Sequence, residues 1–138
     1  MTTFPTHLHI LGRIRTPYTD TSACPRQPWH QPAESVIEVD SEYQQATEGL
    51  AVGTRLHVLW WAHGANRDLR QRSPTAGAAP LGVLAGRGVD RPNPIGLTLA
   101  EVTAIEPGRI SVRGMDCVDG TPLLDLKPAI PVRDEHMQ

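Results

Sequence analysis

Short apolar stretches interrupted by turn-forming residues run along the whole chain and predict a mainly β structure. Residues 8–15 form a first candidate strand, which we expect to end near Pro17 because the residue before a proline favours an extended conformation. Residues 36–39 alternate apolar with other side chains, and residues 55–62 are almost continuously apolar. The latter pattern is typical of a strand that is buried on both faces or enclosed in a barrel.

The C-terminal half also contains short candidate strands separated by turns. Residues 97–105 and 109–115 are two further candidate strands, separated by three residues that include Gly108. A short connection with a glycine predicts an antiparallel hairpin. A tight turn at Gly120 then precedes a last candidate strand at residues 123–126.

One segment has helical spacing instead of strand spacing. Residues 41–50 begin with Ser41, whose hydroxyl could cap the first amides of a short helix. Thirteen prolines and twelve glycines, spread throughout, argue against long helices. We therefore expect an all-β core with one or two short helices, in a single domain over residues 1–138 with no additional C-terminal domain.

The charge balance changes what partners are expected. Thirteen basic and fifteen acidic side chains give a net charge of −2, which lacks the strong basic field of a dedicated nucleic-acid binder. An RNA partner would have to be held by a local patch. Residues 63–79 offer one, since this polar segment contains Arg67, Arg70 and Arg72 and is as long as many functional loops.

Several classes of protein are not supported by the sequence. The two cysteines, Cys24 and Cys117, belong to no Cys-x-x-Cys pair, and the histidines show no ligand spacing, so we expect no metal site. The longest apolar run, residues 58–62, is too short to cross a bilayer, and no signal-peptide pattern is present. We therefore expect a cytoplasmic protein without a membrane partner.

Three segments combine polar side chains with prolines or glycines: residues 24–28, 87–96 and 116–128. We expect them to be loops between strands, where functional residues tend to collect. In the middle segment two prolines bracket Asn93, and Gly96 permits close approach of another group. This arrangement suits a small polar ligand, although a proline-stiffened turn that only links two strands explains it equally well.

Single side chains add weaker signals. His63 ends an apolar strand, where an imidazole could act as an acid or base, but a histidine in this place is more often simply solvated. Trp60 and Trp61 could stack on an adenine ring, yet consecutive strand residues face opposite ways, so at least one is expected in the core. No Gly-x-Gly-x-x-Gly or Walker lysine loop supports a familiar nucleotide site.

Taken in series, the motifs of this chain resemble those of the TrmO (TsaA-like) family of S-adenosylmethionine-dependent methyltransferases over nearly its whole length. The motifs are Leu11-Gly12-Arg13-Ile14, Thr16-Pro17-Tyr18, Pro25-Arg26-Gln27-Pro28, the strands at residues 34–39 and 56–63, Arg91-Pro92-Asn93-Pro94-Ile95-Gly96-Leu97, Asp119-Gly120-Thr121-Pro122 and Leu124-Asp125-Leu126-Lys127-Pro128. No compositional bias generates these motifs in this order.

The resemblance implies a single-sheet antiparallel β-barrel of about eight strands, a homodimer, and S-adenosylmethionine as the cofactor. It implies methylation of the N6 position of threonylcarbamoyladenosine at position 37 of certain tRNAs. By motif, the cofactor would be lined by Pro25, Arg26, Gln27, Arg91, Asn93, Ile95, Gly96, Asp119, Thr121 and Leu124. His63, Asp119 and Arg87 would be the catalytic candidates, and Arg67, Arg70 and Arg72 would contact substrate phosphates.

The chain departs from the family pattern at residues 84–90, where it reads Leu-Ala-Gly-Arg-Gly-Val-Asp. Family members usually have Phe-Ala-Thr-Arg-Ser-Pro and one further residue there. Two other activities therefore stay open beside the tRNA methyltransferase. One is methyl transfer to a small molecule or a protein group by the same type of barrel. The other is a regulatory module that binds S-adenosylmethionine without turnover.

Overall fold

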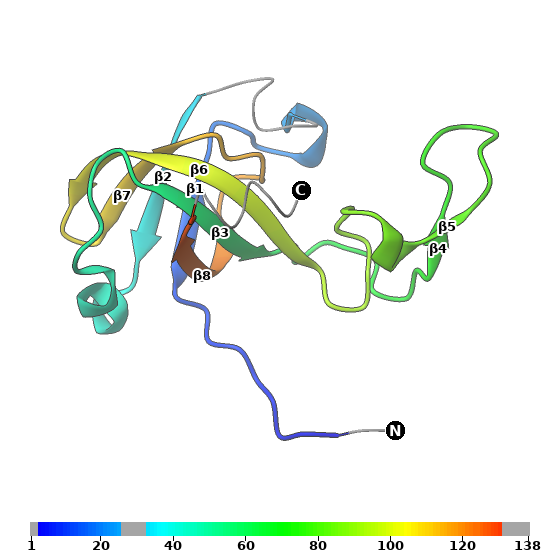
Figure 1. The fold of residues 1–138 in the computed structure, drawn as a ribbon, viewed down its shortest axis with the longest axis horizontal. Coiled ribbons are helices and arrows are strands. Elements are labelled where there is room, and N and C mark those ends of the chain that lie inside the picture. Colours follow the sequence, from blue (N-terminus) through cyan, green and yellow to red (C-terminus); the bar gives the residue numbers. More distant parts are fainter. Residues whose placement is uncertain (1–2, 26–32, 131–138) are drawn as a thin grey trace.

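The computed structural model describes residues 3–25 and 33–130, and its core is a closed antiparallel β-barrel (Figure 1). Six strands surround the core in the order β1-β2-β7-β6-β3-β8, and the ring closes because β1 pairs with both β2 and β8. Their bounds are β1 Gly12–Arg15, β2 Glu34–Val39, β3 Arg55–Trp61, β6 Ile95–Glu106, β7 Arg109–Arg113 and β8 Thr121–Pro128. The expected fold class, a mainly β single-sheet barrel, is confirmed.

The barrel has six strands, where about eight were expected. The other two strands, β4 (Gln71–Arg72) and β5 (Leu81–Gly82), pair only with each other in a separate two-stranded sheet. The residues between β3 and β6 carry this small sheet away from the barrel (Figure 1). We call residues 62–94 the lobe. The segment expected as one long loop therefore contains a strand of its own.

Residues 41–50 form a shorter helix than their spacing indicates. The 3-10 helix η3 covers Ser41–Thr47, and its N-cap is Asp40 rather than Ser41. No side chain caps this helix, so the expected capping role of the Ser41 hydroxyl is wrong. Ser41 is already the first helical residue, and the residue before it, Asp40, holds the N-cap position with its backbone carbonyl, which accepts from the Tyr43 amide at 2.9 Å. The other short helices of the described residues, η1 (Thr21–Ala23) and η4 (Val83–Ala85), are also 3-10 turns. No helix in the described ranges is long and apolar enough to cross a membrane.

The expected hairpin is confirmed by β6 and β7. Ile105 pairs with Ile110 across the turn, and Gly108 adopts a φ of 70°, a left-handed conformation that favours glycine. The register shifts between Val102 and Ala104, which marks a bulge. β6 is a long strand that pairs with β3 at its N-terminal end and with β7 at its C-terminal end.

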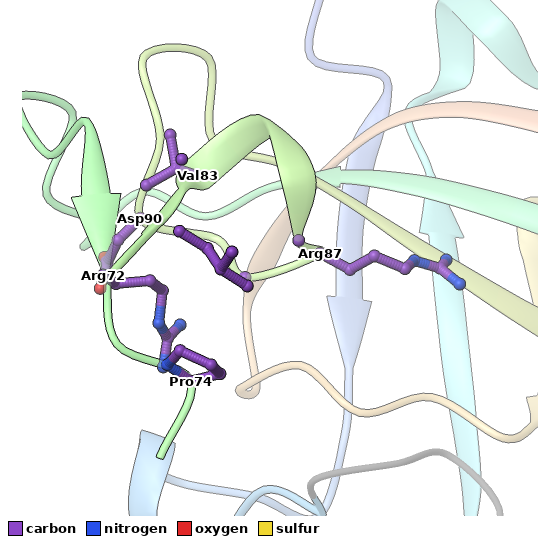
Figure 2. Close-up of a pocket in the computed structure, with 9 residues that line it drawn as sticks. Arg72, Pro74, Val83, Arg87 and Asp90 are labelled. Carbon is purple, nitrogen blue, oxygen red and sulfur yellow. The ribbon is translucent and has the colours of Figure 1, made fainter. Parts of the chain in front are cut away.

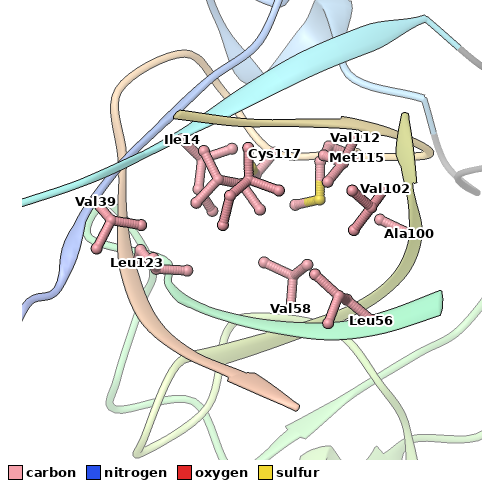
Figure 3. Packing of buried hydrophobic residues seen from close by; sticks show 12 residues of the cluster. Ile14, Val39, Leu56, Val58, Ala100, Val102, Val112, Met115, Cys117 and Leu123 are labelled. Atoms are coloured by element: carbon pink, nitrogen blue, oxygen red, sulfur yellow. The ribbon is translucent and has the colours of Figure 1, made fainter. Parts of the chain in front are cut away.

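Alternating side chains fill the barrel. On β6, Thr98, Ala100 and Val102 are buried, whereas the alternate positions Leu97 and Glu101 are exposed. Figure 3 shows the inward side chains of all six strands meeting in one cluster. The members with no exposed surface are Ile14, Ile37, Leu56, Val58, Val102, Val112, Met115 and Leu123. This single core holds the loops at the barrel ends in place.

Candidate functional site

A half-buried carboxylate, Asp116, lies at one end of the barrel in the loop between β7 and β8. The Trp60 indole N–H, at the end of β3, donates to the Thr98 hydroxyl oxygen at 3.0 Å. The Thr98 hydroxyl in turn donates to Oδ1 of Asp116 at 2.6 Å. Thr98 is only 2% exposed, so both of its hydrogen bonds are shielded from water. We call Trp60, Thr98 and Asp116 the Asp116 relay.

Gly96 places the Trp60 indole in this relay. A Cβ atom built on Gly96 would lie 2.1 Å from Cε2 of Trp60, well inside van der Waals contact. The group that approaches this glycine is therefore a neighbouring indole ring. Trp60 packs against the core cluster, while Trp61 faces outward with the Arg67 guanidinium 5.1 Å from its ring centroid. The two tryptophans thus take opposite faces, as their strand positions predict.

Burial raises the pKa of the Asp116 carboxyl above its ordinary value of 3.8. The Thr98 hydrogen bond and the positive charge of Arg87 act in the opposite direction. Tyr18, after β1, is 4% exposed, and burial raises the pKa of its phenol, with Cys24 and Asp116 adding to the effect. A desolvated carboxylate at a barrel end is a typical mark of a functional site.

Asp116→Asn should change stability in a pH-dependent way. Because the folded-state pKa of Asp116 is raised, its stabilising contribution is present at low pH and is lost as the pH rises from 3.8 through the raised value. The asparagine stays neutral and still accepts from Thr98. We therefore expect the unfolding free energy of the variant, relative to wild type, to increase between about pH 4 and about pH 7 in urea titrations. A relative stability that is flat or falls with pH would contradict the burial of this charge.

The two cysteines are free thiols that both lie near Asp116, one in the N-terminal loop and one beside Asp116 in the chain. Burial raises the pKa of the Cys117 thiol to about 12, and the side chain is 2% exposed, so it is an inert core thiol. Cys24 is half-buried, and the pKa of its thiol is raised by burial and by the negative charge of Asp116. The described residues next to the Pro25 motif therefore lie near Asp116. Pro25 is half-buried, whereas Arg26 and Gln27 fall outside the described residues.

The turn that begins with Asp119 fastens β8 to the end of β1. Oδ1 of Asp119 accepts from the Thr16 amide at 3.1 Å, and the Asp119 amide donates to the Tyr18 carbonyl at 2.7 Å. The Thr121 hydroxyl donates to the Val118 carbonyl at 2.7 Å and is buried. Leu124 is half-buried on β8. The polar groups of this turn thus hold the loop that carries Asp116.

The loop at residues 86–93 is organised by Arg91. Its Nη1 donates to the carbonyls of Gly86 at 3.2 Å and Gly88 at 2.9 Å, so this guanidinium closes the loop on itself. Asn93 is exposed, and its carbonyl accepts from the Ile95 amide at 2.8 Å. Arg87 instead extends out of the lobe toward the barrel (Figure 2). This direction explains its electrostatic effect on Asp116.

The departure from the family pattern has a structural counterpart in the lobe. A Cβ on Gly88 would lie 2.6 Å from Nη1 of Arg72, so the glycine makes room for this guanidinium. The Asp90 carboxylate accepts from the Asn66 amide at 2.9 Å and is half-buried. A cavity of about 200 Å³ lies between these residues, with Pro74, Leu81 and Val83 on its apolar side (Figure 2).

The three arginines of the lobe differ in how they are held. Arg67 donates to the Pro92 carbonyl at 2.8 Å and covers Trp61, and Arg70 donates to the Arg67 carbonyl at 3.1 Å. Arg72 lies on the cavity. All three are exposed, and Arg67 and Arg70 also stabilise the lobe through their hydrogen bonds.

His63 stands apart from the relay, exposed in the turn that follows β3. Among residues 3–25 and 33–130, no three His, Cys, Asp or Glu side chains are close enough to hold a metal ion.

The relay residues Thr98 and Asp116 were not among the site residues expected from the sequence. Asp116 lies in a segment that the sequence marks as a functional loop, but the motif in that segment singled out Asp119 instead. Thr98 carries a recognisable signal, because it is a polar residue at an inward position of the alternating strand at 97–105. The pairing of β3 with β6 brings Thr98 close to Trp60, and the β7–β8 loop brings Asp116 to Thr98.

Comparison with known proteins identifies the family of this fold and site. Residues 13–135 match the family model described as tRNA-methyltransferase O N-terminal domain. The chain also superposes on a crystal structure of TrmO with a TM-score of 0.81 at 34% identity, covering 95% of this chain and 60% of that one. A TrmO structure from Pseudomonas aeruginosa gives a TM-score of 0.78 at 32% identity, covering 95% of this chain and 58% of that chain.

Two curated relatives show the range of names in this family. A probable S-adenosyl-L-methionine-binding protein VirR from Rhizobium radiobacter is 38% identical over 121 residues, which are 88% of this chain and 69% of that protein. The tRNA (adenine(37)-N6)-methyltransferase of Escherichia coli K12 is 36% identical over 132 residues, 88% of this chain and 56% of the enzyme. The chain thus spans little more than half of the enzyme's length.

Proposed function

This chain belongs to the tRNA-methyltransferase O N-terminal domain family, and from that membership we propose that it is an S-adenosylmethionine-dependent methyltransferase that modifies the N6 position of an adenosine in tRNA. The carrying observation is that three motif-bearing loops converge on Asp116. Cys24, in the loop that carries Pro25, and Arg87, in the lobe, both interact electrostatically with Asp116 in the β7–β8 loop.

The described residues at this barrel end fit the proposed cofactor. S-Adenosylmethionine carries a sulfonium, an ammonium group and a carboxylate, and the site offers a carboxylate at Asp116, a phenol at Tyr18 and a guanidinium at Arg87. When bound, the cofactor supplies an activated methyl group. The protein needs mainly to align the acceptor with that group and to exclude water.

We propose the motif residues as the cofactor-binding set: Pro25, Arg26, Gln27, Arg91, Asn93, Ile95, Gly96, Asp119, Thr121 and Leu124. The geometry supports two kinds of contribution. Exposed backbone and side chains at Asn93 and Ile95 could contact a ligand directly. Arg91, Gly96 and Thr121 act through the shape of their loops, because their groups are engaged within the protein.

The lobe is the proposed contact for RNA. Arg67, Arg70 and Arg72 lie on its surface, and Arg87 extends from it toward the barrel. The charge of Asp90 does not oppose this assignment strongly, since its carboxylate is half-buried and bonded to the Asn66 amide. A second candidate is methyl transfer to a small anionic molecule, which the 200 Å³ cavity beside Arg72 favours.

Methyl transfer to tRNA should be directly measurable. With labelled S-adenosylmethionine and threonine tRNA that contains threonylcarbamoyladenosine, we expect one methyl group on that nucleoside, identified by mass spectrometry, and none on an unmodified transcript. Because phosphate contacts release counterions, apparent tRNA affinity should fall steeply between about 50 and about 200 mM salt.

Other outcomes of this experiment would favour one of the alternative functions. Cofactor binding in calorimetry without transfer to any tRNA would remove the RNA substrate, and transfer to a small molecule that is indifferent to salt would establish the second candidate. Binding without transfer to any acceptor would indicate a regulatory module.

Two further properties belong to this proposal. A homodimer is expected from the family resemblance, and the outward face of β6 carries the apolar side chains Ile95 and Leu97, which are 38% and 48% exposed and which a second copy could cover. An activity on tRNA would also place the protein in the cytoplasm.

A further inference from the structure

We propose that Asp116 is the base that takes the proton from the methyl-accepting nitrogen, and that Thr98 is the residue that positions it. This inference rests on the proposed function and deepens it, because it assigns the proton transfer of the same site to one carboxylate. The relay of hydrogen bonds from Trp60 through Thr98 to Asp116 carries the assignment.

The acceptor chemistry calls for a base. The N6 nitrogen of threonylcarbamoyladenosine has one hydrogen and shares its lone pair with the purine ring and the carbamoyl carbonyl, so it attacks a methyl group poorly while it keeps that proton. As the new N–C bond forms, the C–S bond breaks and its electron pair stays on sulfur, which becomes a neutral thioether. The nitrogen would then hold an excess proton, and a carboxylate within reach removes it during the reaction.

The relay fixes which oxygen of Asp116 can receive that proton. Thr98 donates to Oδ1 at 2.6 Å, and its own oxygen already accepts from the Trp60 indole at 3.0 Å. The threonine hydroxyl is therefore committed as a donor to the carboxylate and cannot turn away. Oδ2 is left as the proton-accepting atom, and the acid formed there returns its proton to water, since Asp116 is only half-buried.

The other candidates are held in different ways. Asp119 is exposed, and its Oδ1 accepts from the Thr16 amide, so its carboxylate closes a turn. His63 is exposed at the start of the lobe. Asp116 differs from both because it is partly desolvated and oriented by a buried hydroxyl, which are the two features that make a carboxylate an effective base.

The first test measures single-turnover methyl transfer at saturating cofactor and tRNA for Asp116→Asn. Its control is Glu42→Gln, an exposed carboxylate in η3, and Asp119→Asn is included as the rival candidate. The asparagine at 116 keeps the shape and the acceptor for Thr98, and calorimetry reads any loss of cofactor affinity separately from the rate of the chemical step at saturation. The transfer rate should fall by about 10² to 10⁴, the usual range for a lost general base.

The pH dependence separates a base from a structural role. Asp116 faces Arg87 from the lobe, Tyr18 and Cys24 from the N-terminal loops, and Cys117 from its own loop. The pKa values of Tyr18, Cys24 and Cys117 are all raised, so these groups stay neutral between about pH 4 and about pH 8, and arginine stays charged. Wild-type protein and the Glu42→Gln control should lose rate tenfold per pH unit on the acidic side, whereas Asp116→Asn should not.

A matched pair tests the positioning residue without relying on turnover. Thr98→Val removes the donor at constant shape, and Thr98→Ser keeps it. In ¹³C NMR titrations of the cofactor-free protein, the valine variant should titrate Asp116 at a higher pH than wild type, because the hydrogen bond lowers this pKa, and serine should restore it. The transfer rate should fall on the order of tenfold in the valine variant and recover with serine.

The outcomes separate this inference from the proposed function. Asp116 is not the base if the Asp116→Asn variant is as active as the wild-type protein. It is also not the base if the acidic limb of the pH profile disappears in Asp119→Asn instead. An unchanged Asp116 titration in Thr98→Val overturns the positioning role. If the wild-type protein methylates no tRNA, the proposed function is wrong, and the assignment of the base is then wrong as well.

Discussion

Leu123→Ala should lower the free energy of unfolding by about 2–5 kcal/mol, which is a large part of the stability of a domain this size. Leu123 has no exposed surface, and it lies on β8 between its partners Gly12 on β1 and Trp60 on β3. A closed barrel has no free edge along which these strands could move inward. The cavity should therefore collapse poorly, and the cost should lie toward the upper part of this range.

The same substitution at an exposed leucine provides the control. Leu84 in η4 is 78% exposed, so Leu84→Ala should change the unfolding free energy by no more than about 0.5 kcal/mol in the same urea titrations. Equal effects at the two positions would contradict the closed barrel core. A smaller effect at Leu123 than at Leu84 would do so more strongly.

The strands that were predicted well are those whose evidence lies within a few consecutive residues. The near-continuous apolar run at residues 55–62 became β3, and the glycine-containing connection at 106–108 joined β6 to β7 as a hairpin. In both cases the pattern reflects local backbone geometry. The two-residue strands β4 and β5 have too few positions to show any alternation, so the lobe looked like a loop.

The number of barrel strands depends on contacts that are distant in the sequence. The barrel closes where Gly12 pairs with Leu123, more than a hundred residues apart, and no local pattern reports such a pairing. The expected count of about eight came from the family resemblance. The chain does contain eight described strands, but only six of them share the barrel sheet.

For the candidate site too, local sequence signals were predictable, whereas contacts between segments distant in the sequence were not. Residues 87–96 and 116–128 were expected to be functional loops because of their prolines and glycines. Asp116 lies in the second segment and Arg87 of the first acts on it electrostatically, but residues 121–128 form strand β8 and not a loop. The sequence motif singled out Asp119 and missed Asp116, because the burial of Asp116 and its hydrogen bond to a threonine from a different strand leave no local signal in the sequence. Gly96 was expected to admit a neighbour, but only the pairing with Trp60 identifies the indole as that neighbour.

Gly96→Ala should both destabilise the protein and disable the relay. The added Cβ would meet Cε2 of Trp60 at 2.1 Å, so the indole must shift, and its N–H to Thr98 is a hydrogen bond in a site closed to water. Forcing an extra methyl into a packed site typically costs about 1–3 kcal/mol, and we expect a value near the top of that range in urea titrations. Gly64→Ala is the matched control, because no atom lies within 4 Å of a Cβ there.

The activity of the Gly96→Ala variant links packing to chemistry. If Trp60 no longer holds the Thr98 oxygen, the threonine hydroxyl is free to rotate and Asp116 loses its fixed orientation. Methyl transfer should then fall by at least about tenfold at a temperature where the variant is still fully folded, because a small displacement of a catalytic group is costly. The Gly64→Ala protein should keep the wild-type rate. A folded Gly96→Ala variant with full activity would show that the indole supports the barrel without orienting the carboxylate, and Thr98 alone would then account for the position of Asp116.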